Sequence, residues 1–136
     1  MQGFKGERVL MRIHVDEHDK YHGEPLYVAL VEVLRKHHFA GATVLRGIMG
    51  FGASSKVHSS RSEYLSFNLP VVVECVETEE RIMEILPLFD EMIGGGLITL
   101  ERTKVIMYRP HLKAEERRNS DPIDVTGSRD VQTKSD

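Results

Sequence analysis

The sequence contains one cysteine, no tryptophan and no excess of basic residues. Cys75 cannot form a disulfide within the chain and lies in an apolar run, so we expect a buried thiol without a chemical role. The 18 lysines and arginines are outnumbered by 21 aspartates and glutamates, which gives a formal net charge of −3. A domain that binds nucleic acid normally carries a basic excess, so this composition argues against nucleic acid as a partner.

Long hydrophobic runs are also missing. No stretch approaches the roughly eighteen apolar residues that span a bilayer, and residues 1–6 lack the apolar core of a signal peptide. We therefore expect a cytoplasmic protein. The chain also lacks a nucleophile elbow and a recognisable pair of catalytic carboxylates, and from this we predict that it is not an enzyme.

Regular hydrophobic periodicity is present over the first 110 residues. Alternation of apolar and polar residues predicts a strand at 8–15. Further strands are expected in the strand-like runs 43–49 and 97–109 and in the β-branched, apolar run 70–76. Helical spacing follows Pro25 and is expected to end near Gly41. A second helix is expected after Thr78, a good N-cap residue, and Pro87 should kink or split it.

This order of elements predicts an α+β, ferredoxin-like βαββαβ fold, with a four-stranded antiparallel sheet and two helices on one face. Residues 1–110 are expected to form this domain, and the polar residues 111–136 a disordered C-terminal tail. Apolar residues on both faces of 70–76 and 97–107 indicate that oligomerisation covers the face without helices. Four methionines are expected to fill the core: Met49, Met83, Met92 and Met107.

Two glycine clusters lie at predicted strand ends, Gly50–Gly52 and Gly94–Gly96. Glycine lets successive backbone N–H groups converge on an anion such as a phosphate, although each cluster alone also fits a tight turn. Residues 53–68 are rich in serine and have no periodicity, which predicts a long loop. Long loops inside compact domains are often functional, so this loop is a candidate for binding a partner.

The glycine clusters, together with Gly41-Ala42-Thr43-Val44, Tyr64 and Leu69-Pro70, resemble the PII signalling proteins. More specifically, residues 7–110 resemble the uncharacterised PII-like branch known as DUF190. The resemblance implies a homotrimer that binds a small effector, usually an adenine nucleotide, between subunits and requires no cofactor. It also implies that loop 53–68 engages a target protein, such as a membrane transporter or a metabolic enzyme.

Carried over by position, the resemblance implies two sets of functional residues. The implied ligand-binding residues are Gly50, Gly52, Gly94, Gly95, Gly96, Lys104 and Arg109. The implied residues of the target-binding loop are Lys56, His58, Arg61 and Tyr64. Leu97 and Met107 stand where PII proteins carry phosphate-binding cations. Each lost cation removes a charge-assisted hydrogen bond to phosphate, which contributes about 1.5–3 kcal/mol of binding free energy. The affinity for a triphosphate should therefore fall, and a less charged nucleotide is favoured.

Two other functions stay open on the sequence alone. The first alternative is a trimeric protein that responds to a divalent metal, which the regular spacing of His14, His18 and His22 suggests. However, His14 falls in a strand and the other two in a loop, which implies no shared ligand face, and we predict no metal site. The other alternative is an interaction module that has lost ligand binding, which the missing cation at Leu97 would fit.

Overall fold

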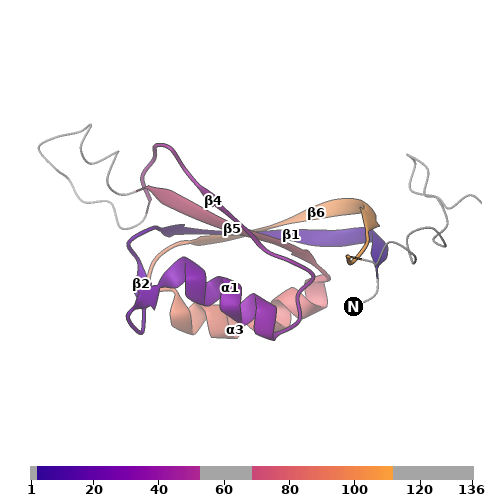
Figure 1. Cartoon of the computed structure of the whole chain (residues 1–136), viewed down its shortest axis with the longest axis horizontal. Helices are drawn as coiled ribbons and strands as arrows, with labels where there is room; N and C mark the ends of the chain where they lie inside the picture. The colour runs from indigo at the N-terminus through magenta and orange to yellow at the C-terminus, as the bar shows by residue number, and fades with distance from the viewer. Residues whose placement is uncertain (1–2, 53–68, 112–136) are drawn as a thin grey trace, which may run out of the picture.

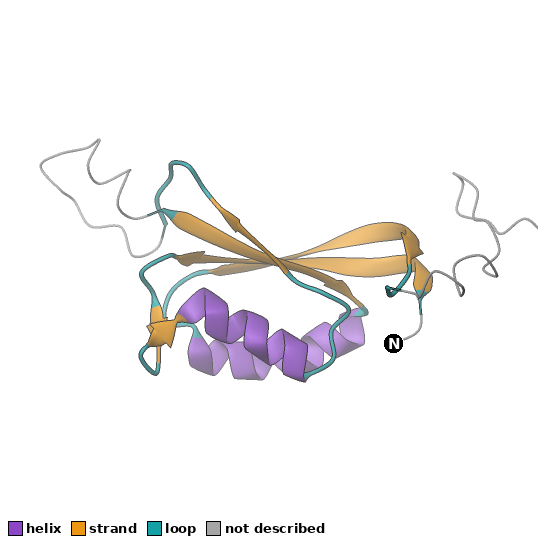
Figure 2. Ribbon diagram, viewed as in Figure 1, coloured by secondary structure: helices purple, strands orange, loops and turns teal. Residues whose placement is uncertain are grey.

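Alternating apolar residues place β1 (Phe4–Asp16) at the centre of the structure. The computed structural model describes residues 3–52 and 69–111. In these residues, a sheet forms one layer and two helices form a second layer on one of its faces (Figures 1 and 2). From Val9 onward, every second residue of β1 is buried beneath the helices: Val9, Met11, Ile13 and Val15.

Three further strands complete the sheet: β4 (Thr43–Arg46), β5 (Pro70–Glu77) and β6 (Leu97–Tyr108). Their order is β4-β5-β1-β6, and each neighbouring pair is antiparallel. Ile13 of β1 lies opposite Val73 of β5 on one side and Ile98 of β6 on the other. The ferredoxin-like βαββαβ fold is therefore confirmed.

The helices α1 (Leu26–Lys36) and α3 (Glu79–Met92) cover the same face of the sheet (Figure 1). Thr78 is the N-cap of α3, and its side chain accepts a hydrogen bond from the Arg81 backbone N–H at 3.4 Å, as predicted. Pro87 lies inside α3, which continues to Met92, so the helix is not split there and the predicted kink stays a prediction. Neither helix in the described part of the chain has the length and apolar character needed to cross a bilayer.

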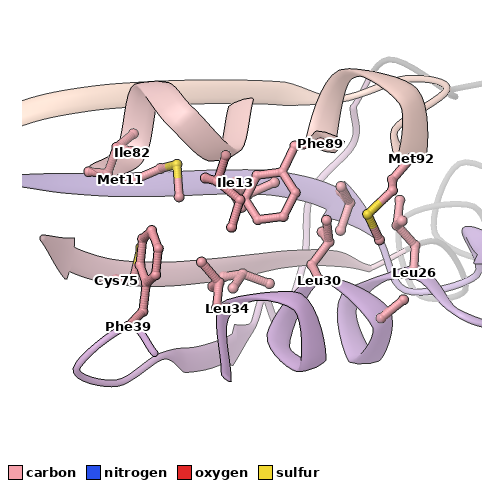
Figure 3. Packing of buried hydrophobic residues seen from close by; sticks show 14 of the residues in the cluster. Met11, Ile13, Leu26, Leu30, Leu34, Phe39, Cys75, Ile82, Phe89 and Met92 are labelled. Carbon is pink, nitrogen blue, oxygen red and sulfur yellow. The ribbon is translucent and has the colours of Figure 1, made fainter. Parts of the chain in front are cut away.

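The core lies between the two layers, where Phe89 of α3 and Leu30 of α1 pack over β1 and β5 (Figure 3). Met11 and Met92 belong to this core. The prediction that Met49, Met83 and Met107 fill it was wrong, because each of these side chains is more than half exposed. The spacing of apolar residues in the sequence could not show that these three side chains lie outside the core between the two layers.

Two element ends differ from expectation. The first helix ends at Lys36, not near Gly41, and His38 takes the positive φ of 59° that follows the helix end. β4 ends at Arg46 instead of residue 49. The Gly47 N–H still donates to the Pro70 carbonyl at 2.7 Å, but Pro70 has no N–H with which to return a second ladder bond, and Ile48 is left 95% exposed. Local hydrogen bonds close the helix end, with the Phe39 N–H donating to the Leu34 carbonyl at 3.1 Å, whereas β4 ends at a proline of its partner strand β5.

The segment between β1 and α1, predicted to be a loop, contains a small hairpin. Its strands are β2 (Lys20–Tyr21) and β3 (Glu24–Pro25), joined by His22 and Gly23 with φ of 50° and 82°. Positive φ at both central residues is typical of a type I′ turn, which matches the twist of a two-residue hairpin.

The face of the sheet opposite the helices is a mixture of apolar and charged residues. Leu10 lies between Val76 of β5 and Glu101 of β6 on this face. Next to it, Arg12 forms ion pairs with Glu74 at 3.0 Å and with Glu101 at 2.9 Å. The residues of β1 that precede Val9 pair only with β6. These parts of the two strands continue as a two-stranded ribbon past the helices (Figure 1).

Candidate functional site

One cavity of about 250 Å³ brings the two glycine clusters together. It lies at the end of the sheet where β1 ends and where β5 and β6 begin. Its wall is formed by residues from four separate stretches of the chain: His14, Val15, Asp16, Asp19, Phe51, Gly52, Pro70, Gly95, Gly96 and Leu97. Gly52, Gly95 and Gly96 were predicted from the sequence to bind a ligand, and here they surround one space.

The glycines of this region differ in what the fold requires of them. A Cβ on Gly96 would lie 2.6 Å from the His14 carbonyl oxygen, so only glycine lets β6 begin so close to β1. A Cβ on Gly50 would lie 3.0 Å from Cγ of Pro70. A Cβ on Gly52 or Gly94 would meet nothing within 4 Å. Packing therefore explains glycine at 96 but leaves glycine at 52 and 94 unexplained.

Residues 16–19, called the acidic turn below, contribute Asp16 and Asp19 to the lining of the same cavity. The Asp16 N–H donates to Oδ2 of Asp19 at 3.0 Å, and the Asp19 N–H donates to the Asp16 carbonyl at 3.1 Å. The His18 N–H donates to Oδ1 of Asp16 at 2.8 Å. These bonds hold the two carboxylates at the end of β1, where Asp16 lies opposite Pro70 in the sheet.

The charge of this wall is unfavourable for a bare phosphate. Among the described lining residues the titratable side chains are His14, Asp16 and Asp19, and none is a lysine or arginine. Backbone N–H groups of the glycines can solvate an anion, but nearby carboxylates repel it. An anionic ligand in this cavity would need cations from elsewhere.

Sequence reasoning missed the acidic turn as part of the site. It treated residues 16–23 as a polar loop, because no local pattern links them to glycines some 80 residues away. One signal was available: polar residues directly after a central strand lie at the edge of the sheet, where other strand ends meet.

Lys104 and Arg109 do not line this cavity. Leu97 pairs with His14 at the cavity, whereas Lys104 pairs with Glu7 further along the ribbon. Seven residues of strand separate Leu97 from Lys104, which corresponds to roughly 23 Å. Arg109 follows β6 at the same far end. Within one chain, these predicted cations are therefore remote from the predicted glycines.

A second cavity, of about 420 Å³, lies toward the end of the sheet that carries Lys104 and Arg109. Most of its lining is apolar, with Glu74, Thr43 and Tyr108 as polar side chains. The rings of Phe4 and Tyr108 lie 4.7 Å apart, and the Tyr108 hydroxyl donates to the Ala40 carbonyl at 3.4 Å. The full lining is Phe4, Leu10, Ala40, Gly41, Ala42, Thr43, Glu74, Cys75, Val76, Val105, Met107 and Tyr108.

The remaining predicted residues are placed as follows. Lys56, His58, Arg61 and Tyr64 lie outside the described residues, as does the tail from residue 112 onward. His14 lies in β1, His18 in the acidic turn and His22 at the tip of the β2–β3 hairpin. Over residues 3–52 and 69–111, no group of three or more His, Cys, Asp or Glu side chains could hold a metal ion.

Cys75 is buried in β5, as predicted. Burial, and secondarily the nearby Glu77 carboxylate, raise the pKa of its thiol to about 12. Because the thiolate is the nucleophilic form, a thiol with so high a pKa stays protonated and unreactive near neutral pH.

Comparison with known proteins finds one matching family and several relatives that are similar in sequence. The model of the DUF190 family, described as an uncharacterized ACR, matches residues 8–105. A UPF0166 protein of Methanocaldococcus jannaschii is 38% identical over 92 residues, covering 67% of this chain and 84% of that protein. A UPF0166 protein of Aquifex aeolicus is 37% identical over 102 residues, covering 74% of this chain and 94% of that protein.

Two solved structures are similar to this chain to different degrees. A protein of Thermus thermophilus described as a PII-like signaling protein superposes with a TM-score of 0.51 at 18% identity, covering 77% of this chain and 93% of its own. The CPII protein of Thiomonas intermedia, solved with ADP, AMP and acetate, gives a TM-score of 0.49 at 11% identity, covering 75% and 91%. At 18% identity, the Thermus likeness establishes the fold alone.

Proposed function

Since the chain belongs to the DUF190 family and has the PII-like fold, we propose that it is a non-catalytic regulatory protein that binds a small anionic effector. The observation that carries this proposal is the cavity in which Gly52, Gly95 and Gly96 converge from distant parts of the sequence. Adenine nucleotides are the class of effector that the PII resemblance implies. Nucleotides with few phosphates fit best, because the described wall has no lysine or arginine.

The effector would bind between subunits of a homotrimer. The glycine-lined cavity needs a cation for a phosphate, while Lys104 and Arg109 lie roughly 23 Å or more away along the ribbon. A neighbouring copy can supply its own ribbon to the cavity. The mainly apolar second cavity, which contains Phe4 and Tyr108, suits the base of the same nucleotide. Both cavities would then be halves of one site shared by two chains.

The segment 53–68, with Lys56, His58, Arg61 and Tyr64, is proposed as the part that engages a target protein. Its two stems are described: residues 46–52 lead into it, and Leu69 and Pro70 lead out of it. Both stems contribute to the cavity through Phe51, Gly52 and Pro70. An effector in the cavity would touch these stems directly. It can shift the segment between states only if it binds one state more tightly than the other.

Calorimetric titration of the purified protein with AMP, ADP, ATP and the cyclic nucleotides, with and without Mg²⁺, tests this function. We expect saturable binding near one nucleotide per chain and no turnover of the nucleotide. Gly95→Asp should abolish binding, because it adds a carboxylate to the wall of the cavity. Met83→Asp is the matched control, because it adds the same charge to an exposed position on α3.

Failure of every nucleotide to bind would refute the nucleotide-binding proposal. An interaction module without a small effector would then be the better description of the chain.

A further inference from the structure

We propose that Glu17 is a positioning residue that couples the wall of the glycine-lined cavity to both stems of segment 53–68. The inference rests on the proposed function, in which this cavity is the effector site. Its starting point is that the acidic turn both lines the cavity and contacts each stem.

Glu17 makes one contact with each stem. Its backbone N–H donates to the Leu69 carbonyl at 3.1 Å, which holds the stem leading out of the segment. Its carboxylate Oε2 lies 2.8 Å from Nη2 of Arg46, which holds the stem leading in. The Glu17 side chain is 16% exposed, so this ion pair is only partly screened by solvent on the carboxylate side.

The neighbours of Glu17 face the cavity. Asp16 and Asp19 line it, and the hydrogen bonds between them make the turn a single rigid unit. A displacement of either carboxylate therefore moves Glu17. Because Glu17 is attached to Arg46 and Leu69, the displacement reaches both stems.

The stems are also joined directly, since the Gly47 N–H donates to the Pro70 carbonyl at 2.7 Å. This hydrogen bond provides a reporter. If the acidic turn supports the stems through Glu17, loosening the turn at the cavity wall should increase the opening of the Gly47–Pro70 bond.

Native-state amide hydrogen exchange on the full chain, without any ligand, tests this coupling. Asp19→Ala removes the carboxylate that accepts the Asp16 N–H, and we expect exchange of the Gly47 amide to accelerate about tenfold. Glu17→Gln should accelerate the same amide by a similar factor. In the double variant, Asp19→Ala should add clearly less than its effect of about tenfold in the natural background, because the ion pair with Arg46 is already lost and only the Glu17 N–H bond to Leu69 still joins the turn to the stems.

The controls separate coupling from general loss of stability. Glu32→Gln removes an ion pair of the same 2.8 Å length on α1, away from the cavity, and should leave Gly47 exchange unchanged. Arg46→Gln breaks the Glu17 pair from its exposed side and should reproduce the Glu17→Gln result if that variant folds poorly. Amides of β1 and β5, measured in the same samples, should exchange equally in all variants.

Multiplicative effects of Asp19→Ala and Glu17→Gln on the Gly47 amide would overturn the proposal. The nucleotide titration decides the proposed function separately. If nucleotides bind but Asp19→Ala and Glu17→Gln act independently on exchange of the Gly47 amide, the proposed effector site is supported and the coupling is refuted. Coupled effects without nucleotide binding would refute the effector class and retain the coupling.

Discussion

At the scale of single residues, glycines that look equivalent in the sequence have different tasks in the structure. Gly94 and Gly96 are two positions apart in the same cluster. Gly96 faces the His14 carbonyl oxygen, an atom of a central strand that cannot shift without disturbing the sheet. Gly94 has no described neighbour within 4 Å of an added Cβ. Only one of the two is therefore explained by packing.

This difference predicts unequal effects of the same substitution. Gly96→Ala should lower the free energy of unfolding by about 1–3 kcal/mol, because its Cβ would overlap a backbone oxygen. Gly94→Ala should change it by less than about 0.5 kcal/mol. Chemical denaturation of the two variants and the natural protein gives both values. Equal losses would show that the close approach of β6 to β1 is not what requires glycine.

The buried thiol predicts a specific dependence of stability on pH. The pKa of Cys75 is raised from 9.0 to about 12 in the folded protein. Between these values the unfolded chain loses the thiol proton and the folded chain keeps it. Stability is therefore fully present below pH 9 and falls as the pH rises toward 12, by up to about 1.4 kcal/mol per pH unit from this group.

Denaturation of the natural protein and of Cys75→Ala across this pH range isolates the effect. Other groups titrate in the same range in both proteins, so the difference between the two curves belongs to the thiol. Cys75→Ala should be less stable at about pH 8, and the gap should narrow as the pH rises. A constant gap would contradict the raised pKa.

At the scale of elements, Arg81 in the first turn of α3 joins that helix to the end of α1. Its guanidinium lies 2.8 Å from Oε2 of Glu77, a carboxylate that is 5% exposed overall. It also donates to the carbonyls of His37 and His38 and stacks over the ring of Phe39. One side chain thus satisfies carbonyls at the α1 terminus and compensates a buried charge.

Arg81→Ala should therefore destabilise the protein by about 3 kcal/mol, because it leaves Glu77 buried without its cation. Arg35→Ala removes an arginine that pairs with Glu32 on the exposed surface of α1, and should destabilise the protein far less, because solvent screens this pair. Thermal unfolding near neutral pH compares them. Similar losses from the two substitutions would show that the Arg81 contacts contribute no more than a surface ion pair.

At the scale of the whole molecule, the face of the sheet without helices is the surface through which we propose that copies assemble. Leu10, Val72 and Val76 are partly buried there, and Leu45 is 49% exposed. The Arg12 pairs with Glu74 and Glu101 cross the same face and satisfy its charges internally. A face whose charges are already paired can be covered by another copy without leaving an isolated buried ion.

We therefore predict that light scattering will give three times the chain mass of 15.5 kDa. Leu10→Asp places an unpaired charge at the centre of the open face and should yield monomers that keep their circular dichroism spectrum. Met83→Asp, on the opposite side of the molecule, should leave the trimer intact. A monomeric natural protein would contradict both the trimer and the site shared by two chains.

The sequence alone predicted the types and order of the strands and helices that make the ferredoxin-like fold. It also predicted the inward face of β1 and the N-cap Thr78. These features depend on local periodicity and on hydrogen bonds between near neighbours, which a single stretch of residues contains. The resemblance of the glycine clusters to PII proteins likewise needed only short motifs.

Tertiary structure alone decided where β4 ends, which methionines are buried, and which residues share the cavity. β4 ends at Arg46 because the next partner in its register, Pro70, has no N–H for a second ladder bond. Asp16 reaches the cavity because β1 pairs with β5 in one register. It also placed Lys104 far from the glycines of its own chain. Each of these facts depends on which distant residues pair across the sheet, and that choice is set by packing the whole core rather than by any local pattern.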